Sequence, residues 1–326
     1  MKLSRRRIMI AAAALPAGLS LPGLAAGPVP LRRWRGVVMG AEAEIVLGVD
    51  DPDRANDLVG KCLAEAARLE QIYSLYQPRS ELVRLNKAGA LVSPSPELLE
   101  VLSASRSLWR ASGGAFDPTV QPLWRLYADW YSTLDADPAG PPPEARERAL
   151  ARVGFDAVEF GPDAVRLHRP GAMLTLNGIA QGHMTDKVAE LLRREGLHHV
   201  LVAFGEIRAL GTRPDGSPWR VGLAAPGQSE AGPLLSVSER AVATSAGAAG
   251  PFGGSGSHNH ILDPRDGSSP RHHTAVTVTA PTAVLADGIS TAIALMPTAE
   301  ARRLISQHEE VEAHLTDHQG RVTRIA

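Results

Sequence analysis

The sequence predicts an α+β fold in which mixed or antiparallel sheets are flanked by helices. Residues 155–237 contain several short runs of β-branched and apolar residues, and most of these runs follow one another without a helix between them. Residues 53–76 and 179–195 instead repeat apolar residues at helical spacing. A doubly wound parallel sheet needs strands and helices to alternate, so that architecture is not expected.

The composition is that of an ordinary globular protein. The chain has 326 residues, of which 44% are hydrophobic and 21% charged, and its formal net charge is −1. Residues 27–326 carry no stripe of lysine and arginine, so a nucleic-acid partner is not expected. The single cysteine, Cys62, excludes an internal disulfide and a cysteine-cluster metal site. It falls on the apolar face of the first predicted helix and is interpreted as a small core residue.

Residues 1–26 are predicted to be an export signal that is not part of the folded domain. Arginines at 5–7 precede an uncharged run over 8–26, and small residues near 23–26 offer a signal-peptidase site. Paired arginines before an Ala/Gly-rich run are typical of a twin-arginine signal, which a receptor reads as an address. Two prolines interrupt the run, so no stable membrane span is expected. We expect residues 27–326 to form the mature domain in the periplasm.

The elements of the first half are expected in the following order. Residues 34–49 alternate in polarity and predict a strand with a bulge at Gly40. The helix over 53–76 and a short helix near 84–86 come next. Ser95-Pro96 reads as an N-cap with a proline at the first helical position, and Gly113-Gly114 closes that helix. Residues 135–143, rich in Pro, Ala and Asp, are interpreted as a surface excursion and a possible lobe boundary before a helix over 144–153.

The second half is predicted to consist mainly of strands. They are expected at residues 157–160, 165–168, 173–176, 200–204, 208–210, 220–223, 234–237 and 275–279. The helix over 179–195 follows the third of them and ends before Gly196. A second helix carries Asp287 and Thr291.

The turn from Leu176 to His183 joins a predicted strand to the start of a helix. Exposed backbone N–H groups and the helix dipole favour an anion there, and Gly178 and Gly182 would let a ligand approach the backbone. A plain tight turn explains the same residues equally well. The spacing matches neither a Walker A loop nor a dinucleotide-binding glycine motif.

Two histidines follow the glycine-rich loop at 253–257. His258 is interpreted as a solvated loop histidine. His260 is expected at the start of a strand, close to the rigid turn Asp263-Pro264-Arg265. A histidine held near neutral pH is the usual group for removing a hydroxyl proton, so His260 is the candidate general base.

Asp287 and Thr291 are four residues apart on a helix rich in Ala, Ile and Leu. This spacing places both side chains on one face, about one turn apart. Their hard oxygen ligands suit Mg²⁺, which proteins hold through one or two side chains together with substrate phosphates. Alternatively, Asp287 is a helix N-cap and the Thr291 hydroxyl bonds back to a carbonyl.

Taken together, these motifs resemble the ApbE-type FAD:protein FMN transferases. The resemblance extends over nearly the whole mature chain, and its specificity comes from the order of motifs that are individually weak. The motifs are residues 39–44, 74–82 with 84–86, 113–118, 178–182 with Asp186, 205–211, 242–245, 260–265, and 285–287 with 291–292.

The resemblance implies a T-fold-related α+β architecture and an enzyme that uses FAD and Mg²⁺. It would move the FMN half of FAD onto a threonine or serine hydroxyl of an exported redox protein and release AMP. The resemblance places flavin contacts at Met39, Tyr76, Ala115, Phe116, Asp117, Thr175, Gln181 and Ile261. It places the metal at Asp287 and Thr291, with a further ligand from the turn that includes Gly178 and Ala180, and it assigns the base to His260.

The chain departs from the family pattern at several positions. Thr175 stands where the family commonly has Asp, Gln181 where it has Lys or Glu, and His183 where it has Tyr. Two other functions remain open: an FAD pyrophosphatase that uses water as acceptor at the same site, and a periplasmic flavin-binding assembly module without catalysis.

Overall fold

A single large antiparallel sheet forms the centre of the protein. The computed structural model describes residues 29–223, 233–247, 251–252 and 258–326. All neighbouring strands of the eight-stranded sheet pair antiparallel. In sheet order they are β1 (Leu31–Val38), β2 (Ala41–Gly48), β6 (Val200–Phe204), β7 (Ile207–Leu210), β10 (Ala241–Ser245), β13 (Ala275–Ala280), β14 (Glu312–Thr316) and β15 (Val322–Ile325).

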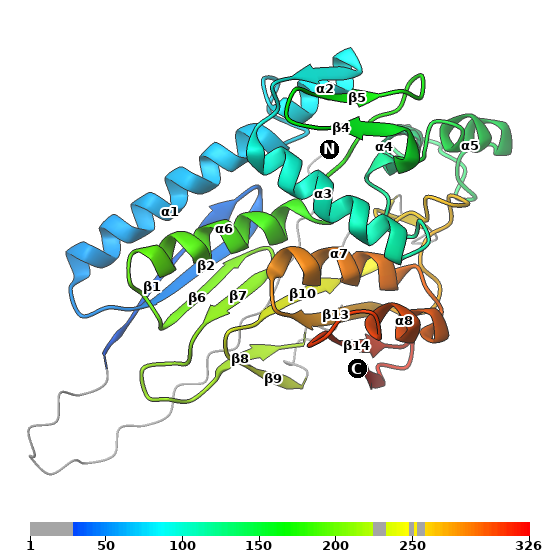
Figure 1. Ribbon diagram of the computed structural model, residues 1–326. Helices are drawn as coiled ribbons and strands as arrows, with labels where there is room; N and C mark the ends of the chain where they lie inside the picture. The colour runs from blue at the N-terminus through cyan, green and yellow to red at the C-terminus, as the bar shows by residue number, and fades with distance from the viewer. Residues whose placement is uncertain (1–28, 224–232, 248–250, 253–257) are drawn as a thin grey trace, which may run out of the picture.

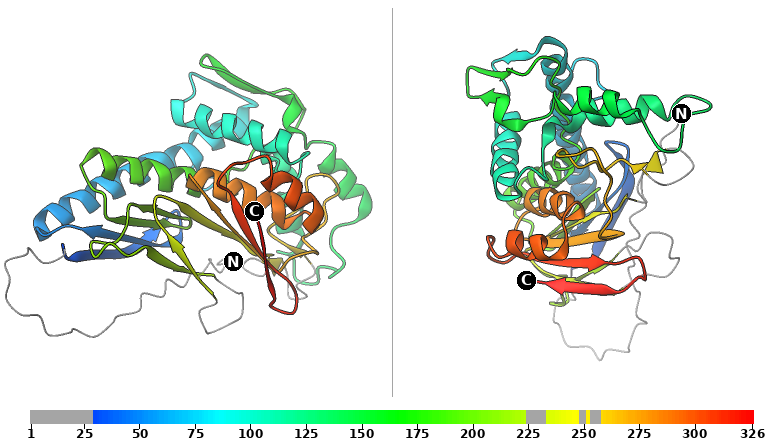
Figure 2. Two further views of the ribbon diagram at one scale, coloured as in Figure 1. Left: turned by 60° about the horizontal axis from the view of Figure 1, so that its bottom comes forward. Right: turned by 90° about the vertical axis from the view of Figure 1, so that its right-hand side faces the viewer.

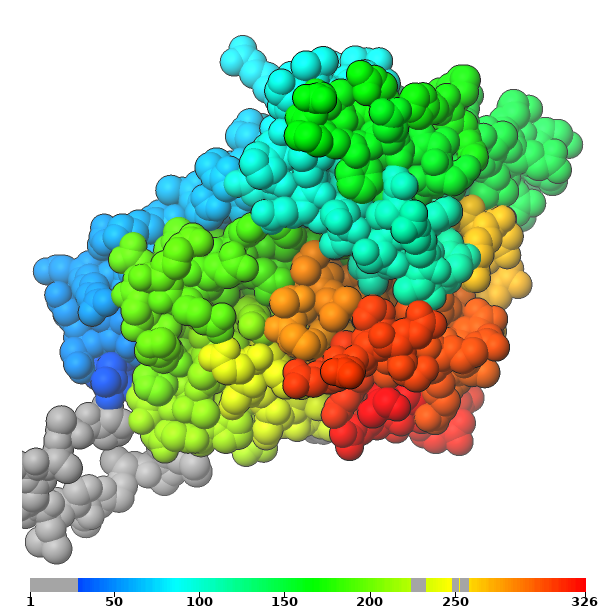
Figure 3. Space-filling model, viewed as in Figure 1, coloured from blue at the N-terminus to red at the C-terminus, as the bar shows by residue number. Residues whose placement is uncertain are grey.

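Helices cover one face of this sheet in two layers (Figures 1 and 2). The inner layer is α6 (Ala180–Arg194) and α7 (Ala283–Ala294), and the outer layer includes α1 (Pro52–Tyr73) and α3 (Pro96–Ala111). The main hydrophobic core lies between sheet and helices. Cys62 belongs to it as predicted, and burial raises the pKa of its thiol to about 12. In the space-filling view the orange segment that contains α7 fills the surface between the cyan α3 and the red C-terminal segment (Figure 3).

Smaller elements complete the molecule. The strands β8 (Trp219–Gly222) and β9 (Leu234–Val237) form a hairpin whose apolar residues pack on the other face of the large sheet, which explains why β6 is buried along its whole length. The remaining elements are α2 (Glu81–Ala88), β3 (Ala90–Val92), η1 (Pro118–Val120), α4 (Gln121–Trp130), α5 (Pro143–Leu150), η2 (Phe155–Ala157), β4 (Val158–Phe160), β5 (Ala164–Leu167), β11 (Pro251–Phe252), β12 (His258–Asn259) and α8 (Thr298–Ile305).

The α+β prediction is confirmed, and the sheets are antiparallel rather than mixed. Ser95 caps α3 as expected, because its side chain accepts a hydrogen bond from the Leu98 N–H. The leader at residues 1–26 lies outside the described residues. Within the described part of the chain, no helix combines the length and apolar character that crossing a membrane requires.

The expected strand over 34–49 is instead a hairpin. The chain reverses at Met39 and Gly40, whose φ angles are 44° and 72°. Two consecutive residues with positive φ form the kind of turn whose twist matches that of antiparallel strands. Polar and apolar residues alternate without a break on both sides of the turn, so the sequence pattern alone does not predict that the chain reverses there.

The strand expected at 173–176 is absent, although the segment is extended. Its backbone groups bond to a side chain and a loop instead of a neighbouring strand. The Asn86 side-chain amide donates to the Leu174 carbonyl at 2.8 Å and accepts from the Leu174 N–H at 2.7 Å, while the Thr175 N–H donates to the Pro118 carbonyl at 2.8 Å. This pairing leads the chain directly into the turn at Gly178.

The start of α7 is held by a carboxylate from α6. Asp186 is buried and accepts hydrogen bonds from the Ala283 and Val284 N–H groups at 2.8 and 2.9 Å. These are orphan donors of the first helical turn, and Thr282, the residue before α7, makes no side-chain cap bond. The Arg208 guanidinium lies 3.7 Å from the same carboxylate. Burial raises the pKa of Asp186, whereas both N–H groups and Arg208 favour its ionised form.

Asp186→Asn should lower the free energy of unfolding by about 2 kcal/mol, because hydrogen bonds to an ionised group and a helix cap are lost together. Urea denaturation followed by circular dichroism measures the change. Glu190→Gln, an exposed acid on the same helix, is the matched control. Equal urea midpoints for the two variants would contradict the conclusion that Asp186 stabilises the start of α7.

Candidate functional site

The candidate site is built where the start of α6 meets the middle of α7. Gly182 lies so close to α7 that a Cβ there would come within 2.4 Å of the Ala283 carbonyl oxygen. Its N–H donates to Asp287 Oδ2 at 3.1 Å. Asp287 is 2% exposed and lies inside α7, so its alternative interpretation as the N-cap of this helix is wrong. The missing side chain of Gly182 therefore allows the carboxylate to reach the first turn of α6.

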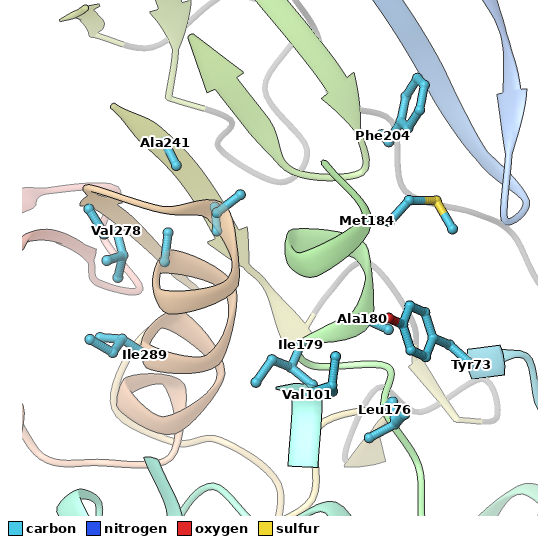
Figure 4. Packing of buried hydrophobic residues seen from close by; sticks show 14 of the residues in the cluster. Tyr73, Val101, Leu176, Ile179, Ala180, Met184, Phe204, Ala241, Val278 and Ile289 are labelled. Carbon is cyan, nitrogen blue, oxygen red and sulfur yellow. The ribbon is translucent and has the colours of Figure 1, made fainter. Parts of the chain in front are cut away.

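The turn before α6 approaches the other predicted metal ligand. A Cβ at Gly178 would lie 3.0 Å from Thr291 Oγ1, which places the backbone of this turn beside the threonine hydroxyl. The structure therefore brings Gly178 close to a helix that carries Asp287 and Thr291 more than one hundred residues later in the sequence. Ala180, the first residue of α6, is buried beside them in the core. In the close-up, the side chains of Ile179 and Ala180 lie among those of the surrounding hydrophobic cluster (Figure 4).

A network of hydroxyl groups from Ser245 in β10 and Ser290 in α7 leads to the Thr291 hydroxyl. Ser245 Oγ lies 3.3 Å from Thr291 Oγ1 and 2.8 Å from Ser290 Oγ, and Ser290 Oγ donates to the Asp287 carbonyl at 2.9 Å. Ser245 and Ser290 are both buried. This network orients the Thr291 hydroxyl and was not predicted as part of the site, although residues 242–245 are one of the motifs.

The donor set fits a hard divalent cation. It consists of the Asp287 carboxylate and the Thr291 hydroxyl, with the backbone of Gly178 beside the hydroxyl. No group of three or more His, Cys, Asp and Glu residues in the described parts of the chain could hold a metal ion. Mg²⁺ accepts few protein oxygens and completes its shell with water and phosphate.

The predicted flavin residues at 115–117 form a tightly structured loop after α3. Ala115 and Phe116 are buried, and the Phe116 N–H donates to Ser112 Oγ at 3.0 Å. Asp117 uses both carboxylate oxygens internally. Oδ1 accepts from the N–H and hydroxyl of Thr119, and Oδ2 accepts from the Phe155 N–H at 3.1 Å. Burial raises the pKa of Asp117 above its usual range, against these hydrogen bonds. Asp117 thus has a structural role in this loop.

The other predicted flavin residues lie on separate elements. Gln181 lies beside Gly205, where a Cβ would come within 2.6 Å of the Gln181 amide. Thr175 is joined to the 115–118 loop through Pro118, as described above. Met39 is half-buried at the β1–β2 turn, and Tyr76 is 69% exposed in the turn after α1.

His260 follows β12 at a bend and not at the start of a strand. The next residue, Ile261, is buried, and its N–H donates to Asn259 Oδ1 at 3.0 Å. The turn beyond it is rigid as predicted, since Asp263 Oδ2 forms a 2.6 Å ion pair with Arg265 Nη2 and Oδ1 accepts from the Arg265 N–H.

The expectation for His258 is wrong. Its ring is half-buried, and Nδ1 lies 2.9 Å from the Tyr131 hydroxyl. The ring centroid also lies 5.0 Å from that of Tyr127. Its aromatic partners belong to α4, far away in sequence, so the glycine-rich surroundings suggested more exposure than the residue has.

A chain of polar contacts behind α6 was also not predicted from the sequence. It runs from the buried Tyr73 and His183 to the exposed Glu100. The Tyr73 hydroxyl lies 2.9 Å from His183 Nδ1, and His183 Nε2 lies 2.9 Å from Glu100 Oε2. Lys187 Nζ pairs with the same carboxylate at 2.7 Å. The chain ties the end of α1 and the middle of α3 to the first turns of α6, next to the candidate site. The one sequence signal was that His183 departs from the family pattern.

Comparison with known proteins identifies the family. A model of the ApbE family matches residues 39–315, most of the chain. The chain belongs to the ApbE family. The FAD:protein FMN transferase of Chlamydia pneumoniae is 30% identical over 251 residues, which cover 74% of this chain and 77% of that protein. The FAD:protein FMN transferase of Salmonella typhimurium is 26% identical over 304 residues, covering 90% and 82%.

Solved structures of the ApbE family share the fold. The flavin transferase ApbE from Vibrio cholerae aligns with a TM-score of 0.77 at 24% identity, covering 91% of this chain and 98% of that chain. The ApbE protein from Thermotoga maritima aligns with a TM-score of 0.80 at 24% identity, covering 91% and 97%. The resemblance and the fold class predicted from the motifs are therefore confirmed, and the chain is an enzyme of this family.

His183 should make the stability of this ApbE protein depend on pH. Burial lowers its pKa below the usual value, although the hydrogen bond to Glu100 opposes this shift. In the unfolded chain a histidine titrates near pH 6.5, so from about pH 6.5 downward the unfolded state binds one proton more than the folded state. Stability should therefore fall as the pH drops through this range, by up to about 1.4 kcal/mol per pH unit for this group.

Thermal unfolding of wild type and His183→Gln between pH 5 and 7.5 isolates this contribution from that of the other histidines. The variant should show a flatter pH dependence than wild type. Parallel curves would mean that His183 has the same pKa in both states.

Proposed function

We propose that this enzyme transfers the FMN moiety of FAD onto a threonine or serine hydroxyl of an exported redox protein, forming a phosphoester and releasing AMP. The observation that carries the proposal is the buried Asp287 carboxylate, which accepts from the Gly182 N–H one helical turn from Thr291, while Thr291 lies beside Gly178. Support also comes from relatives that are named FAD:protein FMN transferases.

The proposed metal is Mg²⁺. Asp287, Thr291 and a carbonyl of the turn at Gly178 and Ala180 would hold it. When bound, it neutralises charge that develops on the FAD pyrophosphate. The rigid packing of Gly182 against α7 keeps the carboxylate in place before the substrate arrives, so little reorganisation would be needed on binding.

His260 is proposed to accept the proton of the acceptor hydroxyl. The hydroxyl oxygen then attacks the phosphorus of the FMN half, a new P–O bond forms, and the bond to the AMP phosphate breaks. AMP leaves with the electron pair and carries the balancing charge. Positioning and electrostatic stabilisation provide most of the acceleration in phosphoryl transfer, so the base has only to lie within hydrogen-bond reach of the hydroxyl.

The flavin is proposed to contact the loop at Ala115, Phe116 and Asp117, with Met39, Tyr76, Thr175, Gln181 and Ile261 completing the set. Asp117 would then act through backbone groups and loop shape, because its carboxylate already bonds to Thr119 and Phe155. The neutral side chains of Thr175 and Gln181 would offer hydrogen bonds rather than charges to the nucleotide.

We also propose that residues 1–26 direct export by the twin-arginine route and that the enzyme acts in the periplasm. The support is the arginine run at 5–7 before an uncharged Ala/Gly-rich segment.

Mature protein mixed with FAD, Mg²⁺ and an exported flavin-acceptor domain should add one FMN to the acceptor, seen as a mass increase. Asp287→Asn should lower the initial rate by at least about 100-fold, because a neutral amide binds the cation poorly. EDTA should abolish the reaction and excess Mg²⁺ should restore it.

Two outcomes would replace the proposal. Release of FMN and AMP at the same rate with and without the acceptor would identify a pyrophosphatase. FAD binding without turnover, together with unchanged flavinylation in cells that carry Asp287→Asn, would identify a non-catalytic assembly module.

His260→Ala should slow transfer by about 100- to 10,000-fold, the usual contribution of a general base. FAD binding, followed by quenching of flavin fluorescence, should stay within twofold of wild type. Loss of FAD binding in this variant would contradict the assignment of His260 as the base.

A further inference from the structure

The helix α4 presents an aromatic face to the short hairpin that leads to His260. The face consists of Trp124 and Tyr127 of α4 and of Tyr131, the residue directly after the helix. The Tyr131 and Phe252 rings are stacked with centroids 6.2 Å apart, and Trp124 contacts the same Phe252 ring edge-on at 5.6 Å. Phe252 in β11 is the direct antiparallel partner of His258 in β12. The hairpin is therefore packed onto α4 through side chains of both strands.

His258 forms the polar part of this contact. The Tyr131 hydroxyl donates to the Pro138 carbonyl at 3.0 Å and lies 2.9 Å from His258 Nδ1. A phenol has a single proton. The Tyr131 hydroxyl can make both hydrogen bonds when it donates to the Pro138 carbonyl and accepts from His258 Nδ1–H. The two bonds together select one neutral tautomer of His258 and lock its ring orientation.

The 138–140 turn packs against the same ring. Gly140 has a φ angle of 93°, and a Cβ there would come within 3.2 Å of His258 Cε1. His258 is thus enclosed by α4 on one side and by the 138–140 turn on the other. Residues 135–143, expected from sequence to be a surface excursion, supply one wall of this enclosure.

The residues that follow are anchored as well. The Asn259 N–H donates to Ser269 Oγ at 3.0 Å, and Asn259 Oδ1 accepts from the Ile261 N–H at 3.0 Å. His260 lies between these anchored neighbours, two residues after His258. Consecutive Cα atoms are about 3.8 Å apart, so only two peptide units separate the anchored His258 from His260.

We propose that Tyr131 and His258 are positioning residues for His260. The bond from His258 to Tyr131 and on to the Pro138 carbonyl fixes the hairpin on α4 and thereby aims the His260 imidazole at the acceptor hydroxyl. The inference rests on the proposed function, because it takes His260 as the group that receives the proton. Misplacement of a catalytic group by about 1 Å can lower a rate by about 100-fold.

Tyr131→Phe tests the inference because it removes the hydroxyl and keeps the stacked ring. The initial rate of covalent FMN formation on the acceptor domain should fall about tenfold, in kcat rather than in KM for FAD. Trp130→Phe is the matched control. The Trp130 indole N–H donates to the Asp137 carbonyl at 3.2 Å, so this variant also loses a bond from the end of α4 to the 131–142 segment. It leaves the ring contacts of His258 with Tyr127 and Tyr131 in place. It should keep the wild-type rate.

A double-mutant cycle separates positioning from general destabilisation. If Tyr131 acts through His260, adding Tyr131→Phe to His260→Ala should cause no further loss of rate. A further tenfold loss in that background would overturn the inference. So would equal rates for Tyr131→Phe and Trp130→Phe.

A second measurement does not depend on transfer activity. Side-chain ¹⁵N spectra of the histidines, assigned with His258→Gln and His260→Ala, should show His258 as the Nδ1-protonated tautomer. Tyr131→Phe should change both the His258 and the His260 signals, whereas Trp130→Phe should leave them unchanged. Unchanged His260 signals in Tyr131→Phe would overturn the inference even if wild type formed no covalent flavin, a result that would refute only the proposed function.

Discussion

The structure depends on a reciprocal pair of contacts between α6 and α7. Asp186 from α6 accepts the first N–H groups of α7, and Asp287 from α7 accepts the Gly182 N–H in the first turn of α6. Each helix thus supplies the carboxylate that satisfies orphan donors of the other. A negative charge at a helix N-terminus is also favoured by the helix dipole. The two contacts fix the position of α6 relative to α7. In this position the turn at Gly178 lies beside Thr291.

This arrangement explains why the helices approach so closely. Backbone contact at Gly182 leaves no space for a side chain, so the buried carboxylate of Asp287 reaches the Gly182 N–H. Burying a charge without such partners would be strongly unfavourable. The same contact fixes the position of the carboxylate at the start of α6. Hydroxyl groups of Ser245 and Ser290 extend the polar surroundings toward Thr291.

The site is assembled on elements of different rigidity. The proposed metal ligands Asp287 and Thr291 lie on a helix packed into the main core, whereas His260, the proposed base, lies beyond a two-residue strand. A short strand cannot hold a catalytic group by its own ladder bonds. The aromatic face of α4 and the bond from His258 to Tyr131 supply the additional constraint. This difference gives a physical reason for an otherwise unexplained cluster of aromatic residues near the site.

The sequence by itself determined the features that depend on local backbone preference. Apolar periodicity located α1 and α6, the Ser95-Pro96 pair located the start of α3, and the order of short motifs identified the family and the residues Gly178, Asp287 and Thr291. Tertiary structure decided which groups pair across long distances in the chain. Asn86 pairs with Leu174 from 88 residues away and removes a predicted strand, and Tyr131 reaches His258 across 127 residues. Such partners are selected by packing, because a side chain bonds to whatever the fold brings within about 3 Å of it, and local sequence carries no record of that neighbour.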